Sequence, residues 1–198
     1  TLLQEQATGI VQPMTDGKAK QPIRILHLSD IHFRASKRWD ADPLLRALND
    51  FIGEEVAGGL KADLVAITGD LAFSGLTDEY KLARAWLDDL WPRLGGLEPD
   101  RLLLVPGNHD VDRRKVDFTV EATQQALLTK RDQAKIATVL GSRAQRDLLL
   151  KRHGAYLKFV AEWLGRREAL PWWQRPIEIR GTKVHVAGLD SAWMACGD

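Results

Sequence analysis

The sequence contains very little cysteine, no long hydrophobic run and no excess of charge of either sign. Cys196 is the only cysteine among the 198 residues, so the chain cannot form an internal disulfide and a cytoplasmic location is expected. No apolar stretch approaches the roughly 18 residues of a membrane span, so no membrane partner is expected. Lys and Arg total 28 against 27 for Asp and Glu, which gives a net charge of +1. That balance provides no overall attraction to nucleic acid or to acidic membranes.

The first part of the chain differs from the rest in its patterning. Residues 1–21 include Gly9, Pro13 and Gly17 and show neither a sustained period nor a signal-peptide pattern, so we expect a flexible N-terminal arm. The remaining residues, 22–198, are long enough for one domain with a sizeable core. Because the first residue is Thr1 rather than Met, we expect a trimmed chain or a fragment.

Strand-like and helix-like segments alternate along residues 22–198. Three apolar runs typical of buried strands and two amphipathic helices appear in the order Ile23–Ser29, a helix from Asp42 to Gly58, Asp63–Thr68, a helix from Thr77 to about Trp91, and Arg101–Val105. Asp42 and Thr77 are the expected N-caps. A helical insertion is expected at about 116–165, with His153 solvated on it, and a hairpin at 177–187. This alternation predicts an α/β fold with a parallel sheet.

Polar residues directly follow each of the three predicted parallel strands. Their order along the chain is Asp30 and His32, then Asp70, then Asn108, His109 and Asp110. The carboxyl ends of parallel strands meet at one edge of the sheet, where ligands bind in such folds. We therefore expect these side chains to converge.

Four of these residues fit a site for two divalent ions. Asp30 and His32 would bind the first ion through one oxygen and one nitrogen. Asp70 would bridge the two ions, and Asn108 would offer a neutral amide oxygen to the second. Two ions about 3.5–4 Å apart would share a hydroxide, and this metal-bound hydroxide would attack a phosphoester.

The last two residues of the third block fit the catalytic step itself. His109 is better suited to the substrate than to a metal, as proton donor to the leaving oxygen or as a stabiliser of developing charge. Asp110 would orient His109. Asp and Gly at strand ends are usually turn formers, so the interpretation depends on finding all three blocks in order.

The blocks Asp30-x-His32, Gly69-Asp70 and Gly107-Asn108-His109-Asp110 resemble those of the calcineurin-like metallophosphoesterase family. The resemblance implies a four-layer α-β-β-α sandwich with two divalent metal ions, of Mn, Fe or Zn, and with His109 beside the phosphate. The surrounding residues 28–33 and 105–113 look most like the branch that contains cyclic-nucleotide phosphodiesterases. That branch favours a phosphodiester or nucleotide-like substrate.

The sequence also departs from the family pattern. The family completes its metal site with three further histidines, one in a Gly-His segment and two in a Gly-His-x-His segment, and this sequence contains neither. In the family both segments follow a stretch that resembles residues 188–193, and this chain ends at Asp198. We therefore expect the N-terminal part of a domain whose sandwich is incomplete at its C-terminal end. Such a piece would be poorly active alone, with the C-terminal remainder of the same protein as a partner.

Two alternatives remain open. The same metal pair would serve a nuclease acting on DNA or RNA, because the attacked bond is chemically alike, although the balanced charge does not favour nucleic acid. A non-catalytic sensor or interaction module of a larger multidomain protein would retain the fold and signal for appended domains. Arg34, soon after His32, is a further cation that would either reach a phosphate or form a surface salt bridge.

Overall fold

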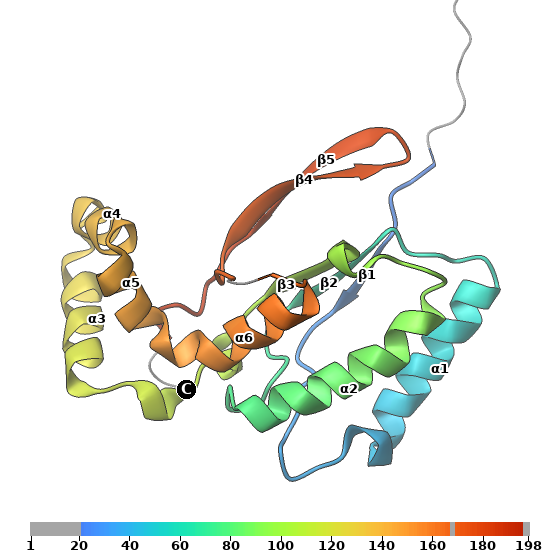
Figure 1. The fold of residues 1–198 in the computed structure, drawn as a ribbon, viewed down its shortest axis with the longest axis horizontal. Helices are drawn as coiled ribbons and strands as arrows, with labels where there is room; N and C mark the ends of the chain where they lie inside the picture. The colour runs from blue at the N-terminus through green and yellow to red at the C-terminus, as the bar shows by residue number, and fades with distance from the viewer. Residues whose placement is uncertain (1–20, 167–168, 196–198) are drawn as a thin grey trace, which may run out of the picture.

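The computed structural model describes residues 21–166 and 169–195, so the arm expected at 1–21 lies, except for Gln21, outside the described part. A three-stranded parallel sheet contains β1 (Ile25–Leu28), β2 (Leu64–Thr68) and β3 (Leu102–Val105) in the order β1-β2-β3. The register pairs Leu26 with Val65 and Val65 with Leu102. The predicted α/β class with a parallel sheet is confirmed, and the three strands point the same way (Figure 1).

Helix α1 (Pro43–Ala57) forms the first crossover between strands. Asp42 caps it as expected, because its carboxylate accepts hydrogen bonds from the amides of Leu44 and Leu45. Pro43 occupies the first helical turn, where its missing N–H costs no intrahelical hydrogen bond.

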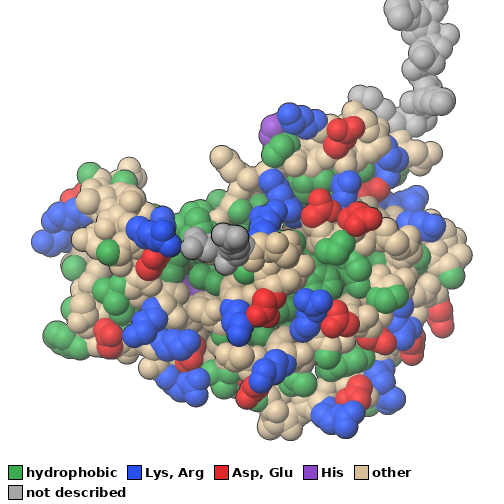
Figure 2. Space-filling model, viewed as in Figure 1, with side chains coloured by type: hydrophobic (Ala, Val, Ile, Leu, Met, Phe, Trp, Pro, Cys, Tyr) green, Lys and Arg blue, Asp and Glu red, His purple; other side chains and the backbone are tan. Residues whose placement is uncertain are grey.

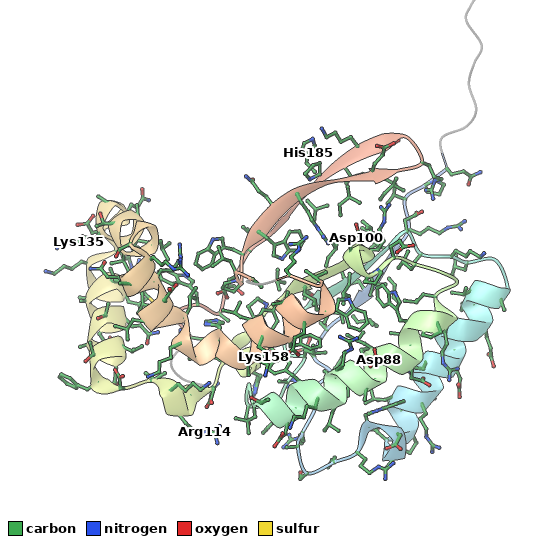
Figure 3. All side chains as sticks on the ribbon, viewed as in Figure 1. Asp88, Asp100, Arg114, Lys135, Lys158 and His185 are labelled. Carbon is green, nitrogen blue, oxygen red and sulfur yellow. The ribbon has the colours of Figure 1, made fainter. Side chains whose placement is uncertain are left out.

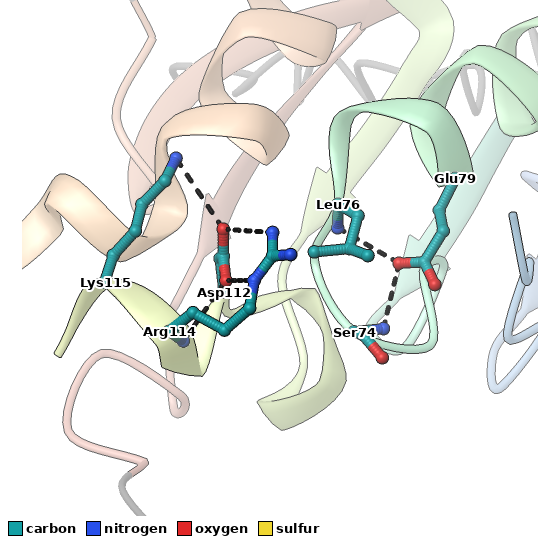
Figure 4. A network of polar contacts seen from close by, with 6 residues as sticks. All are labelled: Ser74, Leu76, Glu79, Asp112, Arg114 and Lys115. Atoms are coloured by element: carbon teal, nitrogen blue, oxygen red, sulfur yellow. Dashed lines mark hydrogen bonds and ion pairs between the residues drawn. The ribbon is translucent and has the colours of Figure 1, made fainter.

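Helix α2 (Thr77–Arg93) forms the second crossover between strands. The prediction that Thr77 is its N-cap is wrong. Thr77 is the first helical residue, and the N-cap is Leu76, which has no polar side chain. Glu79 satisfies the free amides instead, since its carboxylate accepts from the amides of Ser74 at 2.9 Å and Leu76 at 3.0 Å (Figure 4). A glutamate at the third helical position reaches back in this way in a capping box.

The two faces of the sheet pack against different layers, because side chains alternate along each strand. Val65 and Ile67 face a core that also contains Trp86 of α2 and residues of α6 (Gly154–Trp163). Leu64 and Leu103 face the opposite way and pack against the C-terminal hairpin. Helices and hairpin therefore cover opposite faces of the parallel sheet.

The hairpin consists of β4 (Trp173–Ile179) and β5 (Thr182–Gly188), paired antiparallel. Arg180 and Gly181 connect the strands with φ values of 48° and 76°. Two consecutive positive φ angles match the right-handed twist of a tight hairpin. Helices, parallel sheet and hairpin give three successive layers in the described residues, which follow the α-β-β part of the expected α-β-β-α order (Figure 1).

The segment expected to be a helical insertion holds α3 (Phe118–Lys130), α4 (Gln133–Gly141), α5 (Arg143–Leu150) and α6. The ring of Phe159 on α6 stacks on that of Tyr80 on α2 at 5.4 Å between centroids, whereas α3 to α5 form a lobe beside the sheet (Figure 1). Short 3₁₀ turns are η1 (Trp39–Ala41), η2 (Pro99–Arg101), η3 (Asn108–Asp110), η4 (Arg113–Lys115) and η5 (Lys151–His153). Within the described residues, no helix has both the length and the apolar character that a membrane span requires.

The expectation that His153 is solvated is wrong, because its side chain is fully buried. His153 lies in η5, the turn between α5 and α6, and its Nε2 is 3.5 Å from the carboxylate of Asp190. Burial, together with the nearby charge of Arg152, lowers the pKa of His153 to about 3. Burial also raises the pKa of Asp190 to about 6. Helical periodicity alone did not show that the chain turns inward at η5.

Candidate metal centre

Three loops leave the carboxyl ends of β1, β2 and β3 and run side by side. The amide of Asp30 donates to the carbonyl of Gly69 at 3.2 Å, and the amide of His32 donates to the carbonyl of Asp70 at 2.9 Å. The amide of His109 in turn donates to the Asp70 carboxylate at 2.9 Å. These contacts bring together residues up to 79 positions apart in sequence, as the strand-end argument predicts, and Asp70 lies between the other two loops.

The backbone is in the left-handed region at three of the predicted metal ligands. Asp30, His32 and Asp70 have φ values of 57°, 56° and 53°. This region costs free energy for residues other than glycine, although Asp and His enter it more readily than most. The loops after β1 and β2 thus turn sharply at their candidate ligands.

Gly107 allows the closest approach in the site. A Cβ atom built on it would lie 2.6 Å from the backbone nitrogen of Asp70 and 2.8 Å from its Cγ. Real Cβ atoms do not approach neighbours so closely, so a side chain at this position would displace Asp70. The φ of Gly107 is −102°, which any residue adopts, so glycine is required here for space alone.

Three potential ligands meet in one cluster: the Nδ1 or Nε2 atom of His32, a carboxylate oxygen of Asp70 and a ring nitrogen of His109 all lie within 4.8 Å of one another. The Oδ1 atom of Asp30 is 4.0 Å from Nε2 of His32, and its side chain is 67% exposed. Asn108 precedes His109 in the chain, begins η3 and is half-buried. The cluster includes His109, which the sequence assigned to the substrate rather than to a metal.

The imidazole of His109 is fixed by its surroundings. Its Nδ1 lies 2.8 Å from the carbonyl oxygen of Phe73. A carbonyl only accepts hydrogen bonds, so Nδ1 carries the proton and Nε2 is the atom available to a metal or a phosphate. The ring also meets that of His32 edge-on, at 4.7 Å between centroids and 86° between planes.

Asp110 is fully buried behind the cluster. Its carboxylate accepts from the amides of Leu71 at 3.2 Å, Ala72 at 2.9 Å and Gly107 at 3.0 Å, and from the hydroxyl of Tyr80 at 2.8 Å. Burial raises the pKa of Asp110 despite these hydrogen bonds, which favour its charged form. The residue ties the β2 loop to the β3 loop, while the His109 ring is held by Phe73.

A cavity of about 460 Å³ opens beside His109 and is lined by Phe73, Ser74, Leu76, Val111, Asp112, Arg113 and Arg114. Arg114 extends outward from η4 (Figure 3) and binds both carboxylate oxygens of Asp112, at 2.9 and 3.1 Å (Figure 4). Burial acts to raise the pKa of Asp112, but the hydrogen bonds from Arg114 outweigh it and lower the pKa below its ordinary value.

Two residues that the sequence did not single out support the site. Phe73 supplies the carbonyl that fixes His109, and Tyr80 supplies a hydroxyl to Asp110. Tyr80 lies within the helix expected from Thr77 to about Trp91, but helical periodicity shows which way a side chain points and not what its polar end meets. No local signal in the sequence identified Phe73.

The donor set fits divalent cations. Carboxylates and imidazoles together suit Mn, Fe or Zn. Nδ1 of His32 is buried without a hydrogen-bond partner among the described residues, and its Nε2 faces Asp30 at 4.0 Å, beyond hydrogen-bonding distance. An unpartnered ring nitrogen with the carboxylates of Asp30 and Asp70 nearby suits a metal-binding position.

Comparison with other proteins places the chain in a family of phosphoesterases. The model of the calcineurin-like phosphoesterase family matches residues 23–191. Over 144 residues the chain is 26% identical to an uncharacterized metallophosphoesterase-like protein, YydB, of Bacillus subtilis (strain 168). That match covers 72% of this chain and 28% of the relative, so the chain spans well under a third of the relative's length.

Proposed function

The chain belongs to the calcineurin-like phosphoesterase family, and we propose that it contributes a dinuclear metal centre that hydrolyses a phosphodiester or nucleotide-like substrate. Membership of the family implies metal-dependent hydrolysis of phosphoesters. The observation that carries the proposal is the convergence of His32, Asp70 and His109 within 4.8 Å, with Asp30 beside His32.

The proposed ligands divide between two ions, of Mn, Fe or Zn. Asp30 and His32 would hold the first, Asp70 would serve as a ligand to both, and Asn108, at the start of η3, would offer its amide oxygen to the second. Such a pair, when bound, supplies an activated water and neutralises the charge that develops on the phosphate oxygens. The contact between the amide of His109 and Asp70 holds this carboxylate between the other two loops.

His109 and Asp110 have separate roles in the proposed reaction. His109 keeps its proton on Nδ1 through Phe73, so Nε2 is the nitrogen that would donate a hydrogen bond or a proton to the phosphoester when the ring is charged. If a metal takes that nitrogen instead, the ring becomes a ligand and substrate activation falls to other groups. Asp110 is a positioning residue, because its buried carboxylate fixes both loops rather than the imidazole.

We propose that the chain alone is a weak catalyst. The histidine segments that complete the site in the family have no counterpart in its sequence. The nucleotide-like substrate rests on the resemblance of residues 28–33 and 105–113 to one branch of the family. A nuclease is less favoured, because Lys and Arg are interspersed with Asp and Glu over the face shown in Figure 2 rather than gathered into a stripe.

The test compares D70N with D88N. Asn at 70 keeps the oxygen that accepts from His109 but loses the charge, whereas Asp88 pairs with Arg84 on the surface of α2. Hydrolysis of bis(p-nitrophenyl) phosphate with and without Mn²⁺, and Mn²⁺ affinity by calorimetry, are measured for both. D70N should lose activity and more than about tenfold in affinity, since even supporting residues are worth about 10–100-fold. D88N should match the wild type. Equal Mn²⁺ binding by wild type and D70N would refute the metal centre and favour a non-catalytic module.

A further inference from the structure

Arg34 lies against an aromatic ring beside the cluster of candidate ligands. Beyond the ends of β1 and β2 the loops stay paired, because Phe33 forms an isolated parallel bridge with Ala72 and accepts a hydrogen bond from the amide of Phe73 at 3.0 Å. Phe33 is buried and its ring packs against Trp86. Arg34 follows this anchored residue, and its guanidinium carbon lies 3.3 Å from the centroid of the Phe73 ring.

The same aromatic ring contacts both imidazoles of the cluster. Phe73 lies 5.4 Å from His109 and 6.0 Å from His32 between ring centroids. One phenyl ring therefore connects the Arg34 guanidinium to the two histidines. A group that extends from a phosphate at the cluster past the edge of Phe73 would come to this guanidinium.

No acidic side chain of the described residues compensates the charge of Arg34. Within residues 21–166 and 169–195, no ion pair involves Arg34, whereas Arg114, which lines the cavity beside His109, is neutralised by Asp112. A guanidinium over an aromatic ring uses its flat face for that contact. Its N–H groups lie in the plane and remain free to bind an oxyanion through two parallel hydrogen bonds.

We propose that Arg34 is a specificity-determining residue that binds a second phosphate next to the scissile one. The substrate class is then a phosphorylated compound with two adjacent phosphate groups, of which the first is held at the metal cluster. This inference rests on the proposed function, because the cluster must hold the first phosphate. Phe73 separates the Arg34 guanidinium from the cluster. Arg34 therefore favours substrates with a second negative group at that distance and contributes little to the binding of substrates without one.

The experiment uses methylphosphonate and methylenediphosphonate, which carry one and two phosphonate groups and are not hydrolysed at their P–C bonds. Both are titrated by calorimetry into wild type, R34Q, R34K and R84Q, at one fixed concentration of free Mn²⁺ and again without metal. R84Q is the matched control, because Arg84 also lies over an aromatic ring, that of Trp163 at 4.7 Å, but on α2.

R34Q should bind methylenediphosphonate about tenfold more weakly than wild type. This loss corresponds to the lower end of the contribution made by a hydrogen bond to a charged group, because Arg34 is exposed. Its affinity for methylphosphonate should change less than about twofold. R34K, which keeps the charge and loses the planar donors, should be intermediate, and R84Q should match the wild type. Equal loss for both ligands, or no loss, would overturn the inference while Mn²⁺-dependent binding of methylphosphonate still supported the metal centre. If the wild type binds neither ligand in the presence of Mn²⁺, the proposed function fails and this inference fails with it.

Discussion

Replacing Gly107 by alanine should disable the metal centre while leaving the rest of the fold in place. The added Cβ would lie 2.8 Å from Cγ of Asp70 and 2.6 Å from its backbone nitrogen. Ordinary carbon contacts begin at about 3.5 Å, so the carboxylate has to move by about 0.7 Å. Metal sites tolerate deviations of roughly 0.2 Å in ligand distance. The displacement is therefore several times what the site accepts.

The expected loss is about 10–100-fold in Mn²⁺ affinity, which is the usual effect of disturbing the support of a ligand. Overpacking should also cost roughly 1–3 kcal/mol of stability. Calorimetric titration with MnCl₂ measures the first quantity and urea unfolding the second. G141A is the control, because a Cβ at Gly141 would meet no atom within 4 Å. Mn²⁺ affinity of G107A within about twofold of the wild type would show that the contact with Asp70 does not position a ligand.

Three further substitutions test the surroundings of the site. Asp110→Asn, which weakens a carboxylate held by three amides and Tyr80, should lower the free energy of unfolding by about 3 kcal/mol in urea titrations; a change below about 1 kcal/mol would contradict its buried positioning role. Gly75→Ala should also destabilise by more than about 1 kcal/mol, because φ is +65° and the new Cβ would lie 2.6 Å from the carbonyl carbon of Val111; unchanged thermal unfolding would argue against it. The pKa of Asp190 is raised to about 6 by burial, so the native state binds more protons there than the unfolded chain. The protonated carboxyl stabilises the native state fully below the unfolded pKa of about 4, and this contribution is lost as pH rises through 6. The stability of Asp190→Asn relative to wild type should therefore rise by about 2 kcal/mol from pH 4 to 7; parallel stability curves would refute this.

The sheet and the meeting of the three blocks were predictable from sequence for a physical reason. Short apolar runs that alternate with amphipathic helices form parallel strands, and parallel strands place their carboxyl ends at one edge. Asp30, Asp70 and His109 therefore had to lie near one another once the strands were identified. The role of Asp42 as N-cap of α1 was equally predictable, because an N-cap depends on contacts within three residues.

The features that escaped prediction depend on contacts between distant residues. The need for glycine at 107 arises from Asp70 in another loop, and the burial of His153 from packing between α5, α6 and Asp190. The role of Asp110 follows from amides of the β2 loop. Neither periodicity nor local spacing contains this information. The positive φ angles at three ligand positions likewise follow from the pairing of loops rather than from residue type.

The most direct measurement of the proposed metal centre is the position of bound manganese in crystals of the chain soaked with MnCl₂, read from anomalous scattering at the manganese edge. We expect the strongest anomalous peak between Asp30, His32 and Asp70, and a second on the Asn108 side of Asp70. Crystals saturated with Mn²⁺ that show these side chains ordered and no anomalous peak among them would contradict the assignment of strand-end residues to a metal site.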